Sequence, residues 1–355
     1  YIVIGIAVFQ AALGLMQYGA GPNSPLYFGN EYAKGASGTW LNQDHYAGFL
    51  EMVFPVALAL MAATVGMNKN KKRQPSNWRS KLSFMSSVKG NKTIIYFSII
   101  VLIILALIFT RSRAGVGLAM VGLFLSMFVF ANRLGGNNVY GSVGTVTAVI
   151  IVLAIEIGLA PILDRFSVDP LEDLRWTIYG SSMAGVGSFF PLGSGAGTFP
   201  TVYPIFQPLE LDHFINRAHN DYLEWIFDGG ILPLLIFAMF LVLYIMGWKK
   251  LWIPQRWATF RFIQAGAGIG IFLMILHTLV DFNLHKPANA VFFAFMLAVF
   301  FKHNTEEAEL VKHSRRKKRT RTKRMDHGEA MAAAAQENPA IPSQIDEPVE
   351  PENNR

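Results

Sequence analysis

Long apolar runs, separated by short polar connections, dominate the chain. Each run is about 17 to 25 residues long, the length that an α-helix needs to cross the hydrocarbon core of a bilayer. The predicted fold class is therefore all-α, a polytopic membrane helix bundle of about eight spans. The chain begins inside an apolar run, so we expect that further spans precede it. The predicted spans are residues 1–17, 46–66, 93–110, 114–131, 142–161, 220–247, 262–280 and 288–302.

Composition agrees with a membrane protein and excludes several other classes. Hydrophobic residues make up 52% of the 355 positions and charged residues only 15%, whereas about a quarter of an average soluble protein is charged. An ordinary soluble enzyme is therefore excluded. Since the chain contains no Cys, disulfides, thiolate metal sites and a cysteine nucleophile are excluded as well.

The basic residues predict which connections face the cytoplasm. One alternating set of connections, which includes the segment from residue 302, holds 24 of the 31 Lys and Arg residues. The positive-inside rule assigns this set to the cytoplasm. The cytoplasmic set comprises 67–92, 132–141, 248–261 and the tail, and the periplasmic set comprises 18–45, 111–113, 162–219 and 281–287.

We predict two domains, a membrane domain over residues 1–303 and a disordered cytoplasmic tail over 304–355. The stretch 315–324 of the tail is strongly basic. Because this stretch lies close to the last span, attraction to anionic lipid head groups, worth about 1 kcal/mol per basic residue, is the simplest explanation of its charge. Anionic membrane lipids, and no nucleic acid, are the predicted partners of the tail.

The periplasmic side carries the remaining basic residues. Five of these seven are Arg, whose guanidinium group suits bidentate recognition of phosphate or carboxylate. The longest periplasmic connection, 162–219, holds three of these Arg residues, and loops of that length usually carry function. The seven residues are Lys34, Arg111, Arg113, Arg165, Arg175, Arg217 and Lys286.

Arg111 and Arg113 lie in a turn so short that both must stay close to the membrane surface. There they face either lipid phosphate, by snorkelling, or a bound anion. Arg175 lies in a hydrated loop, where snorkelling explains it less well.

Residues 217–225 precede and begin the predicted span 220–247. Asp221 and Glu224 have the spacing of a capping box, with Asp in place of Ser or Thr and with Asn220 as a neighbour of the cap. Such a cap does not require His219 or Arg217. A His beside an Arg at a helix N-terminus suits a site that holds a phosphorylated substrate and moves a proton. A structural cap and a catalytic site both remain possible interpretations.

The glycine-rich stretch 193–199 lacks the preceding strand and following helix of a dinucleotide-binding loop. We interpret it as a flexible or tightly turned element that lets the backbone approach a ligand or another loop.

Acidic residues within or beside the spans keep a transporter possible, since such residues can mark ion or proton relays. Only Glu156 is expected to lie deep, so no proton pathway across the whole bilayer is evident. The acids are Glu51, Glu156, Asp228 and Asp281.

Five short motifs follow one another along the chain: Asn42–Glu51, with Asp44 at its third position; Ser112-Arg113-Ala114; Arg175 with Tyr179; Pro191–Phe199; and His219-Asn220 with Gly230. In this order they resemble the Asn-x-Asn-His-x-Ala, Ser-Arg-Gly/Ala, Arg-x-x-x-Leu/Trp/Tyr, Pro-x-Gly-x-Gly-x-Gly-x-Phe and His-Asn/Ser-x9-Gly motifs of the O-antigen ligase and polymerase superfamily, which are bacterial membrane glycosyltransferases. The departure from this pattern is Asp44, where the family more often has Asn.

The resemblance implies an enzyme of the bacterial inner membrane that transfers a glycan from undecaprenyl diphosphate to an acceptor at the periplasmic face. The acceptor would be lipid A core, a growing polysaccharide or a protein, and neither a cofactor nor a metal is implied. Preorganised Arg side chains would stabilise the negative charge that grows on the leaving diphosphate. Arg113 and Arg175 are assigned to this role, with Arg111 and Arg217 as further candidates.

The resemblance also implies roles on the acceptor side. His219 would activate or orient the acceptor hydroxyl, and Asn220 would help to position it, so the catalytic candidates are His219, Asn220 and Arg175. Further site candidates are His45, Asp281, Gly195 and Gly197.

Three other functions stay open. A polymerase of the same superfamily shares the donor chemistry and differs in the acceptor, and we favour the ligase over it. A transporter or flippase of lipid-linked or anionic solutes would be expected to show internal repeats and broken helices, and the two halves show no repeat. A membrane scaffold would explain the basic tail but not the periplasmic arginines.

Overall fold

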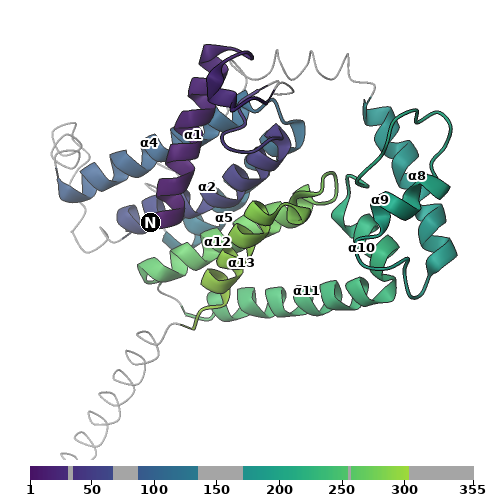
Figure 1. The fold of residues 1–355 in the computed structure, drawn as a ribbon. Helices are drawn as coiled ribbons and strands as arrows, with labels where there is room; N and C mark the ends of the chain where they lie inside the picture. Colours follow the sequence, from purple (N-terminus) through teal and green to yellow (C-terminus); the bar gives the residue numbers. More distant parts are fainter. Residues whose placement is uncertain (31–34, 67–86, 135–170, 255–256, 304–355) are drawn as a thin grey trace, which may run out of the picture. The chain divides into compact units, whose positions relative to one another are not determined.

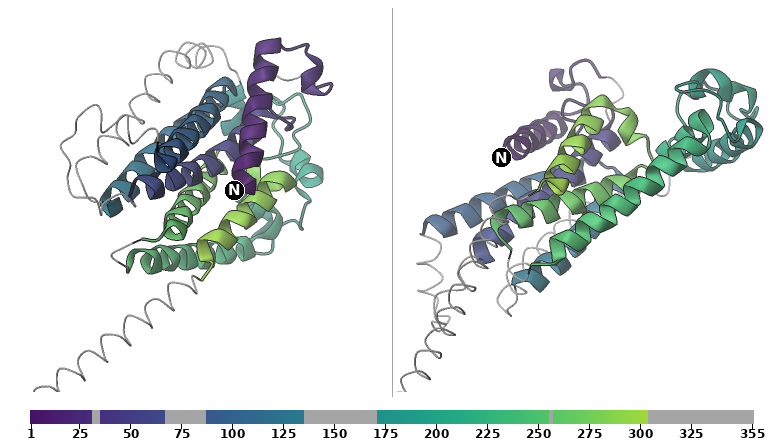
Figure 2. Two further views of the ribbon diagram at one scale, coloured as in Figure 1. Left: turned by 90° about the vertical axis from the view of Figure 1, so that its left-hand side faces the viewer. Right: turned by 90° about the horizontal axis from the view of Figure 1, so that it is seen from below.

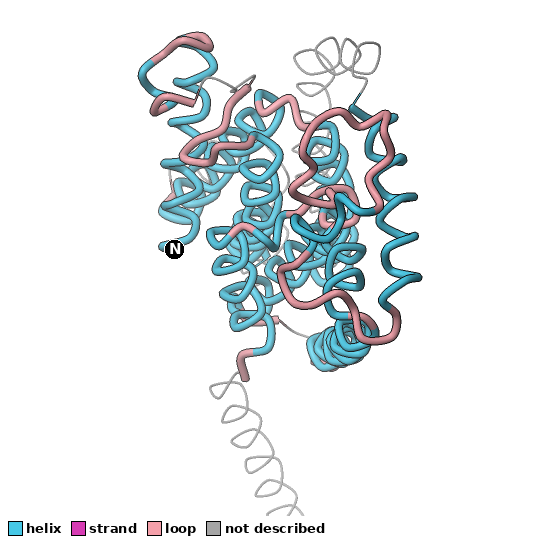
Figure 3. The backbone as a smooth tube through the Cα atoms, turned by 45° about the vertical axis from the view of Figure 1, so that its right-hand side comes forward, coloured by secondary structure: helices cyan, strands magenta, loops and turns pink. Residues whose placement is uncertain are grey.

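The computed structural model describes residues 1–30, 35–66, 87–134, 171–254 and 257–303 (Figure 1). The predicted span 142–161, the tail 304–355 and the residues Lys34, Glu156 and Arg165 lie outside these ranges. Throughout the described ranges the chain forms helices joined by loops, and no strand occurs there (Figure 3). The predicted all-α fold class is confirmed.

Six of the described helices are long and apolar enough to cross a membrane. Their bounds lie close to predicted spans, except for the span predicted at 220–247. The shorter apolar helix α13 (Pro287–Phe301) corresponds to the last predicted span. The six helices are α1 (Ile2–Ala20), α2 (Gln43–Gly66), α4 (Val88–Phe109), α5 (Arg113–Leu134), α11 (Ile231–Trp252) and α12 (Thr259–His277).

The prediction of one span over 220–247 is wrong, because the chain breaks at Gly230. Here φ is +61°, and an added Cβ atom would lie 2.0 Å from the carbonyl oxygen of Pro191. Only glycine tolerates both the left-handed backbone and the close approach. The short helix α10 (Asp221–Gly229) ends at this point and α11 continues as one long helix (Figure 2).

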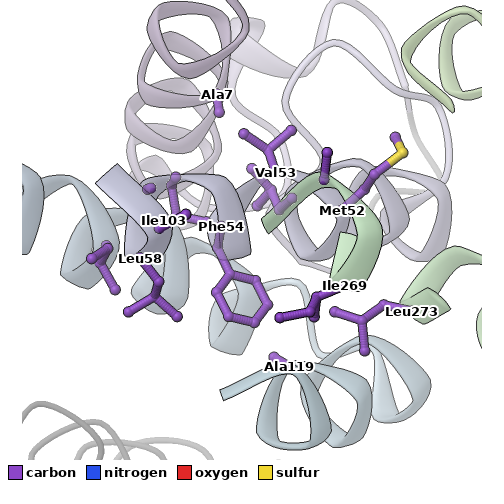
Figure 4. Close-up of a cluster of buried hydrophobic side chains, with 14 of the residues drawn as sticks. Ala7, Met52, Val53, Phe54, Leu58, Ile103, Ala119, Ile269 and Leu273 are labelled. Atoms are coloured by element: carbon purple, nitrogen blue, oxygen red, sulfur yellow. The ribbon is translucent and has the colours of Figure 1, made fainter. Parts of the chain in front are cut away.

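Helix α2 occupies the centre of the bundle, and it packs against α1, α4, α5, α12 and α13, part of which Figure 4 shows. The labelled residues of α2 in this cluster are Met52, Val53, Phe54 and Leu58, and those around them are Ala7 of α1, Ile103 of α4, Ala119 of α5, and Ile269 and Leu273 of α12. An added Cβ at Gly270 of α12 would lie 2.1 Å from the carbonyl oxygen of Met52. Small residues permit this close packing of backbones in membrane helices.

Contacts at the two ends of the bundle agree with alternating spans. At one end, the start of α13 meets the start of α2, where Asn289 donates from Nδ2 to the carbonyl oxygen of His45 at 2.8 Å. At the other end, Arg133 of α5 donates to the carbonyl oxygen of Trp252 at 2.6 Å. The first end gathers the connections that the basic residues assign to the periplasm.

The described part of the long connection 162–219 is itself folded. It contains α8 (Leu171–Phe189), the short α9 (Phe199–Val202) and a 3-10 turn over Tyr203–Ile205. Outside this connection, another 3-10 turn, Asn283–His285, precedes α13. Helices α8, α9 and α10 and the 3-10 turn Tyr203–Ile205 enclose a second hydrophobic cluster around Phe227. The ring of Phe227 contacts the rings of Phe189, Phe199 and Phe206. The cluster fixes the start of α10, where His219 lies.

Candidate active site

Asp281 is a buried carboxylate between two histidines from distant parts of the chain. Its Oδ2 lies 3.1 Å from Nδ1 of His45, at the start of α2, and its Oδ1 lies 3.7 Å from Nδ1 of His219, just before α10. The ring of Phe282 is edge-on to both imidazoles, with centroid distances of 4.6 and 4.9 Å. Three of the predicted site residues, distant in sequence, therefore share one site.

Asp281 is negatively charged at neutral pH. Burial acts to raise the pKa of its carboxyl group, but His219 and His45 beside it hold the pKa well below the ordinary value of 3.8. A buried carboxylate next to an imidazole fixes the orientation of that ring and stabilises the imidazolium ion. The arrangement can therefore support a histidine that accepts a proton.

Different groups hold the backbone and the ring of His219. Its backbone has φ +51°, a left-handed conformation that is uncommon for a residue other than glycine and costs about 1–3 kcal/mol. The hydroxyl of Tyr179 donates to its carbonyl oxygen at 2.8 Å. The side chain is 32% exposed, while Nδ1 is buried on the side of Asp281. The exposed part of the ring is available to a substrate.

The cap of α10 differs from the predicted capping box, which is wrong. Asn220 is the N-cap, and its Oδ1 accepts hydrogen bonds from the backbone N–H groups of Tyr222 and Leu223 at 3.0 and 3.1 Å. Asp221 instead accepts from the N–H of Leu284 at 2.9 Å. The box fails because the extended backbone that a cap requires falls at Asn220.

Asp221 and Glu224, two of the three acids of α10, hold chain segments close to His219. Asp221 contacts Nδ1 of His285, and Glu224 lies 3.2 Å from Nε2 of the same ring. Glu224 also accepts from the backbone N–H of Ala218 at 3.0 Å and from Nη1 of Arg217 at 2.5 Å. Arg217 is thus engaged with a fully buried carboxylate, which favours a structural role for it at the entry to α10.

Arg175 reaches the same site from α8. Its Nη1 donates to the carbonyl oxygen of Val280, the residue before Asp281, at 3.2 Å. Tyr179, which binds the backbone of His219, lies one helical turn further along α8. One face of α8 therefore brings a guanidinium group and a clamp on His219 to the Asp281 loop.

The turn with Arg111 and Arg113 lies at the same end of the bundle. Arg113 is the first residue of α5, and Oγ of Ser112 accepts from the N–H of Gly115 at 3.2 Å. An added Cβ at Gly115 would lie 2.5 Å from Cβ of Ala47, which lies two residues after His45. This close contact places the turn against the part of α2 that carries His45.

The predicted candidates Gly195 and Gly197 lie at the end of α10 that is remote from His219. The N–H of Gly195 donates to the carbonyl oxygen of Asp228 at 2.9 Å, and that of Gly197 donates to the Asp228 carboxylate at 2.8 Å. Of the two interpretations of this glycine-rich stretch, the structure shows approach to another chain segment. These hydrogen bonds join the glycine-rich stretch to the end of α10, beside the hydrophobic cluster around Phe227.

Sequence reasoning gave no role to three basic residues near the site. His277 ends α12 and its Nδ1 lies 2.8 Å from the carboxylate of Glu51, with both side chains fully buried. This pair explains the boundary acid Glu51 without an ion pathway. Lys286 lies with Nζ 4.6 Å from the Phe282 ring centroid, and burial, followed by the charge of Arg217, lowers its pKa. The third residue is His285, which only the folded chain brings beside Asp221 and Glu224 of α10.

Within the described ranges, no three His, Asp or Glu side chains are arranged to hold a metal ion.

An apolar helix bundle with a partly buried acid–histidine site at one end defines a polytopic membrane protein with the groups for acid–base chemistry. Residues 98–238 match the family model described as O-antigen ligase. The match covers less than half of the chain and supports its resemblance to the O-antigen ligase superfamily of membrane glycosyltransferases. Neither the comparison with curated proteins nor that with solved structures found a match.

The matched region contains His219 and the candidate arginines but not the whole site. It runs from α4 into α11. His45 and Asp281 lie on either side of it in sequence, and the fold brings both of them to His219.

Proposed function

We propose that the protein transfers a glycan from undecaprenyl diphosphate to a hydroxyl acceptor, at the end of the bundle that carries Asp281. We place this end at the periplasmic face of the inner membrane, with the C-terminus in the cytoplasm. The observation that carries the proposal is the buried Asp281 carboxylate beside the partly exposed ring of His219. The match of residues 98–238 to the O-antigen ligase family model supports the donor and acceptor classes.

His219 is the proposed general base. The acceptor hydroxyl oxygen bonds to the anomeric carbon of the glycan, and the bond from that carbon to the diphosphate oxygen breaks. The electron pair of the broken bond leaves with undecaprenyl diphosphate, and the hydroxyl proton passes to the exposed side of the His219 ring. Asp281 stabilises the resulting imidazolium ion, and His45 holds the second carboxylate oxygen.

Arg175 and Arg113 are the proposed diphosphate ligands, and Arg111 is a further candidate. Guanidinium groups bind phosphate oxygens in a bidentate manner, and they stabilise the leaving group most when its charge is greatest. The hydrogen bond from Arg175 to the carbonyl oxygen of Val280 holds this guanidinium beside the Asp281 loop. In this proposal the arginines supply the positive charge, and no metal ion is needed.

Asn220 acts in the proposal by capping α10. Because its Oδ1 already accepts two backbone hydrogen bonds, the cap fixes the peptide that joins it to His219. Asn220 thereby positions the base, in addition to the contact with the acceptor that the family resemblance implies.

We favour a ligase, with lipid A core or another glycan as the acceptor, over a polymerase. The test is reconstitution of the purified protein into vesicles with a lipid-linked oligosaccharide donor and a lipid A core or glycan acceptor. Release of undecaprenyl diphosphate together with a glycosylated acceptor is the expected result. Transfer onto another donor molecule would indicate the polymerase. Movement of the intact lipid between leaflets, without product, would indicate a transporter and contradict the proposal.

A further inference from the structure

One side of α8 exposes a stripe of apolar residues. Trp176, Met183 and Phe190 follow one another at intervals of seven, the last of them directly after the helix, and they are 73%, 58% and 52% exposed. Gly180 and Gly187 lie between them, and an added Cβ at either position would meet open space. These five residues are named the α8 stripe. Their spacing puts them along one face of a helix, while Ile178 and Val186 on the other side belong to the cluster around Phe227.

From Trp176 onward, the chain along the α8 stripe and directly after it is uncharged. Residues 176–209 include no Asp, Glu, Lys, Arg or His, and the charged residues of α8, Glu172, Asp173 and Arg175, all precede the stripe. Protein surfaces that face water normally intersperse charged residues of both signs, and interfaces between proteins have a polar rim. An exposed apolar patch without such residues is typical of a surface that meets lipid.

The lipid-facing surface of α11 continues into this region. Few residues of α11 are fully buried, and its first residues, Ile231 and Leu232, are exposed. The N–H of Ile231 donates to the carbonyl oxygen of Pro191 at 2.9 Å. In the sequence, Pro191 follows Phe190, the last residue of the stripe, and precedes Leu192, whose side chain is 84% exposed. Apolar surface therefore extends from the spanning helix α11 to the end of α8.

The direction of α8 agrees with a position along the membrane surface. Figure 1 shows α8 running across the direction of α11, near the end at which α11 begins. A helix that lies across the end of a spanning helix runs along the surface of the bilayer, where Trp side chains are enriched.

We propose that the α8 stripe is a membrane-docking surface, which inserts into the boundary between head groups and acyl chains of the leaflet where α11 begins. The occupant of the stripe is membrane lipid. The stripe begins at Trp176, directly after Arg175, so docking would hold the guanidinium of Arg175 at the level of lipid phosphate groups. Only this last consequence rests on the proposed function, since it places Arg175 at the depth of the donor diphosphate.

Because the chain contains no Cys, a single introduced Cys can carry a nitroxide spin label at a chosen position. The full chain with Met183→Cys is labelled and reconstituted into vesicles of phosphatidylethanolamine and phosphatidylglycerol. Electron paramagnetic resonance then compares collisions of the label with oxygen, which concentrates in lipid, and with a water-soluble nickel chelate. Leu235→Cys on the exposed side of α11 is the lipid control, and Asp212→Cys, at a position 94% exposed in a charged loop, is the water control.

The expected result is that the Met183 label collides with oxygen more than with nickel, as at Leu235 and opposite to Asp212. Trp176→Cys gives a second position on the stripe if the first variant inserts poorly. Collision with nickel as frequent as at Asp212 would overturn the proposal. Exclusion of both reagents would overturn it too, since another protein surface would then cover the stripe. The measurement does not depend on glycan transfer, so its failure and the failure of the proposed function are distinguishable.

Discussion

Replacing Asp281 with Asn tests the contribution of the buried carboxylate. The substitution keeps the size of the side chain and removes the negative charge 3.7 Å from Nδ1 of His219. At an effective dielectric constant of about 20, this charge would stabilise an imidazolium ion at that distance by about 4 kcal/mol. The full loss corresponds to roughly a 10³-fold slower reaction. Because the amide oxygen can still orient a neutral ring, we expect Asp281→Asn to reduce glycan transfer roughly 10²–10³-fold.

The assay is single-turnover release of undecaprenyl diphosphate by protein reconstituted with lipid-linked oligosaccharide and acceptor. Asp212→Asn is the matched control, because it also removes a carboxylate beside a histidine, with Oδ1 of Asp212 3.2 Å from Nδ1 of His213 in an exposed loop. The control should transfer glycan at the unmodified rate. If Asp281→Asn, inserted at a normal level, keeps its rate within a few-fold, the carboxylate does not stabilise a charged His219 and the reasoning is refuted.

The effect of Asp281→Asn on thermal stability should depend on pH. The folded pKa of Asp281 is depressed below 3.8, so its stabilising contribution is fully present above that pH and is lost as the pH falls below it. The difference in Tm between the unmodified protein and Asp281→Asn should be largest above pH 3.8 and shrink at lower pH. Thermal unfolding of both proteins in detergent across this range measures it. A difference that stays constant would contradict the assigned charge.

Three further pairs of substitutions separate structural roles from chemical ones. Asn220→Ala should lower stability by about 0.5–2 kcal/mol and reduce transfer, whereas Asn220→Asp should restore both through the cap; a loss of transfer in both variants would show that the amide has another role. Gly230→Ala should prevent normal folding, because its Cβ would lie 2.0 Å from a backbone oxygen, while Gly187→Ala, with open space around it, should unfold at an equal or higher temperature. Arg175→Lys keeps the charge but loses the fork geometry, so transfer should fall, whereas Arg261→Lys, which also loses a 3.2 Å bond to a backbone carbonyl, should leave transfer unchanged; equal rates for both would remove Arg175 from the diphosphate role.

Much of the bundle could be predicted from the sequence, because spanning helices need long apolar runs that are visible in the residue order. The break at Gly230 could not be predicted from hydropathy alone. The run from Ile226 to Leu235 contains Asp228-Gly229-Gly230 and Pro233, residues that often mark a break, but the apolar pattern resumes at once and does not report backbone conformation. What requires the break is the approach of Pro191, a contact that exists only in the folded protein.

The candidate site could be predicted in its parts but not in its geometry. His219, Arg175, His45 and Asp281 all follow from motifs or from unusual positions of polar residues. Their spacing along the chain does not show that His45 and His219 share one carboxylate, because three separate segments supply the groups. The cap was assigned to Asp221 because helix boundaries are uncertain by a residue or two in sequence, and a shift of one residue makes Asn220 the cap.

The central claim is that His219 moves the proton of the acceptor hydroxyl. The most direct test is the single-turnover transfer rate of His219→Ala, in protein inserted at a normal level and saturated with donor and acceptor. A general base is worth typically 10²–10⁴-fold, and we predict a loss of roughly that size. A loss of only a few-fold would contradict the claim and leave His219 as a structural neighbour of the Asn220 cap.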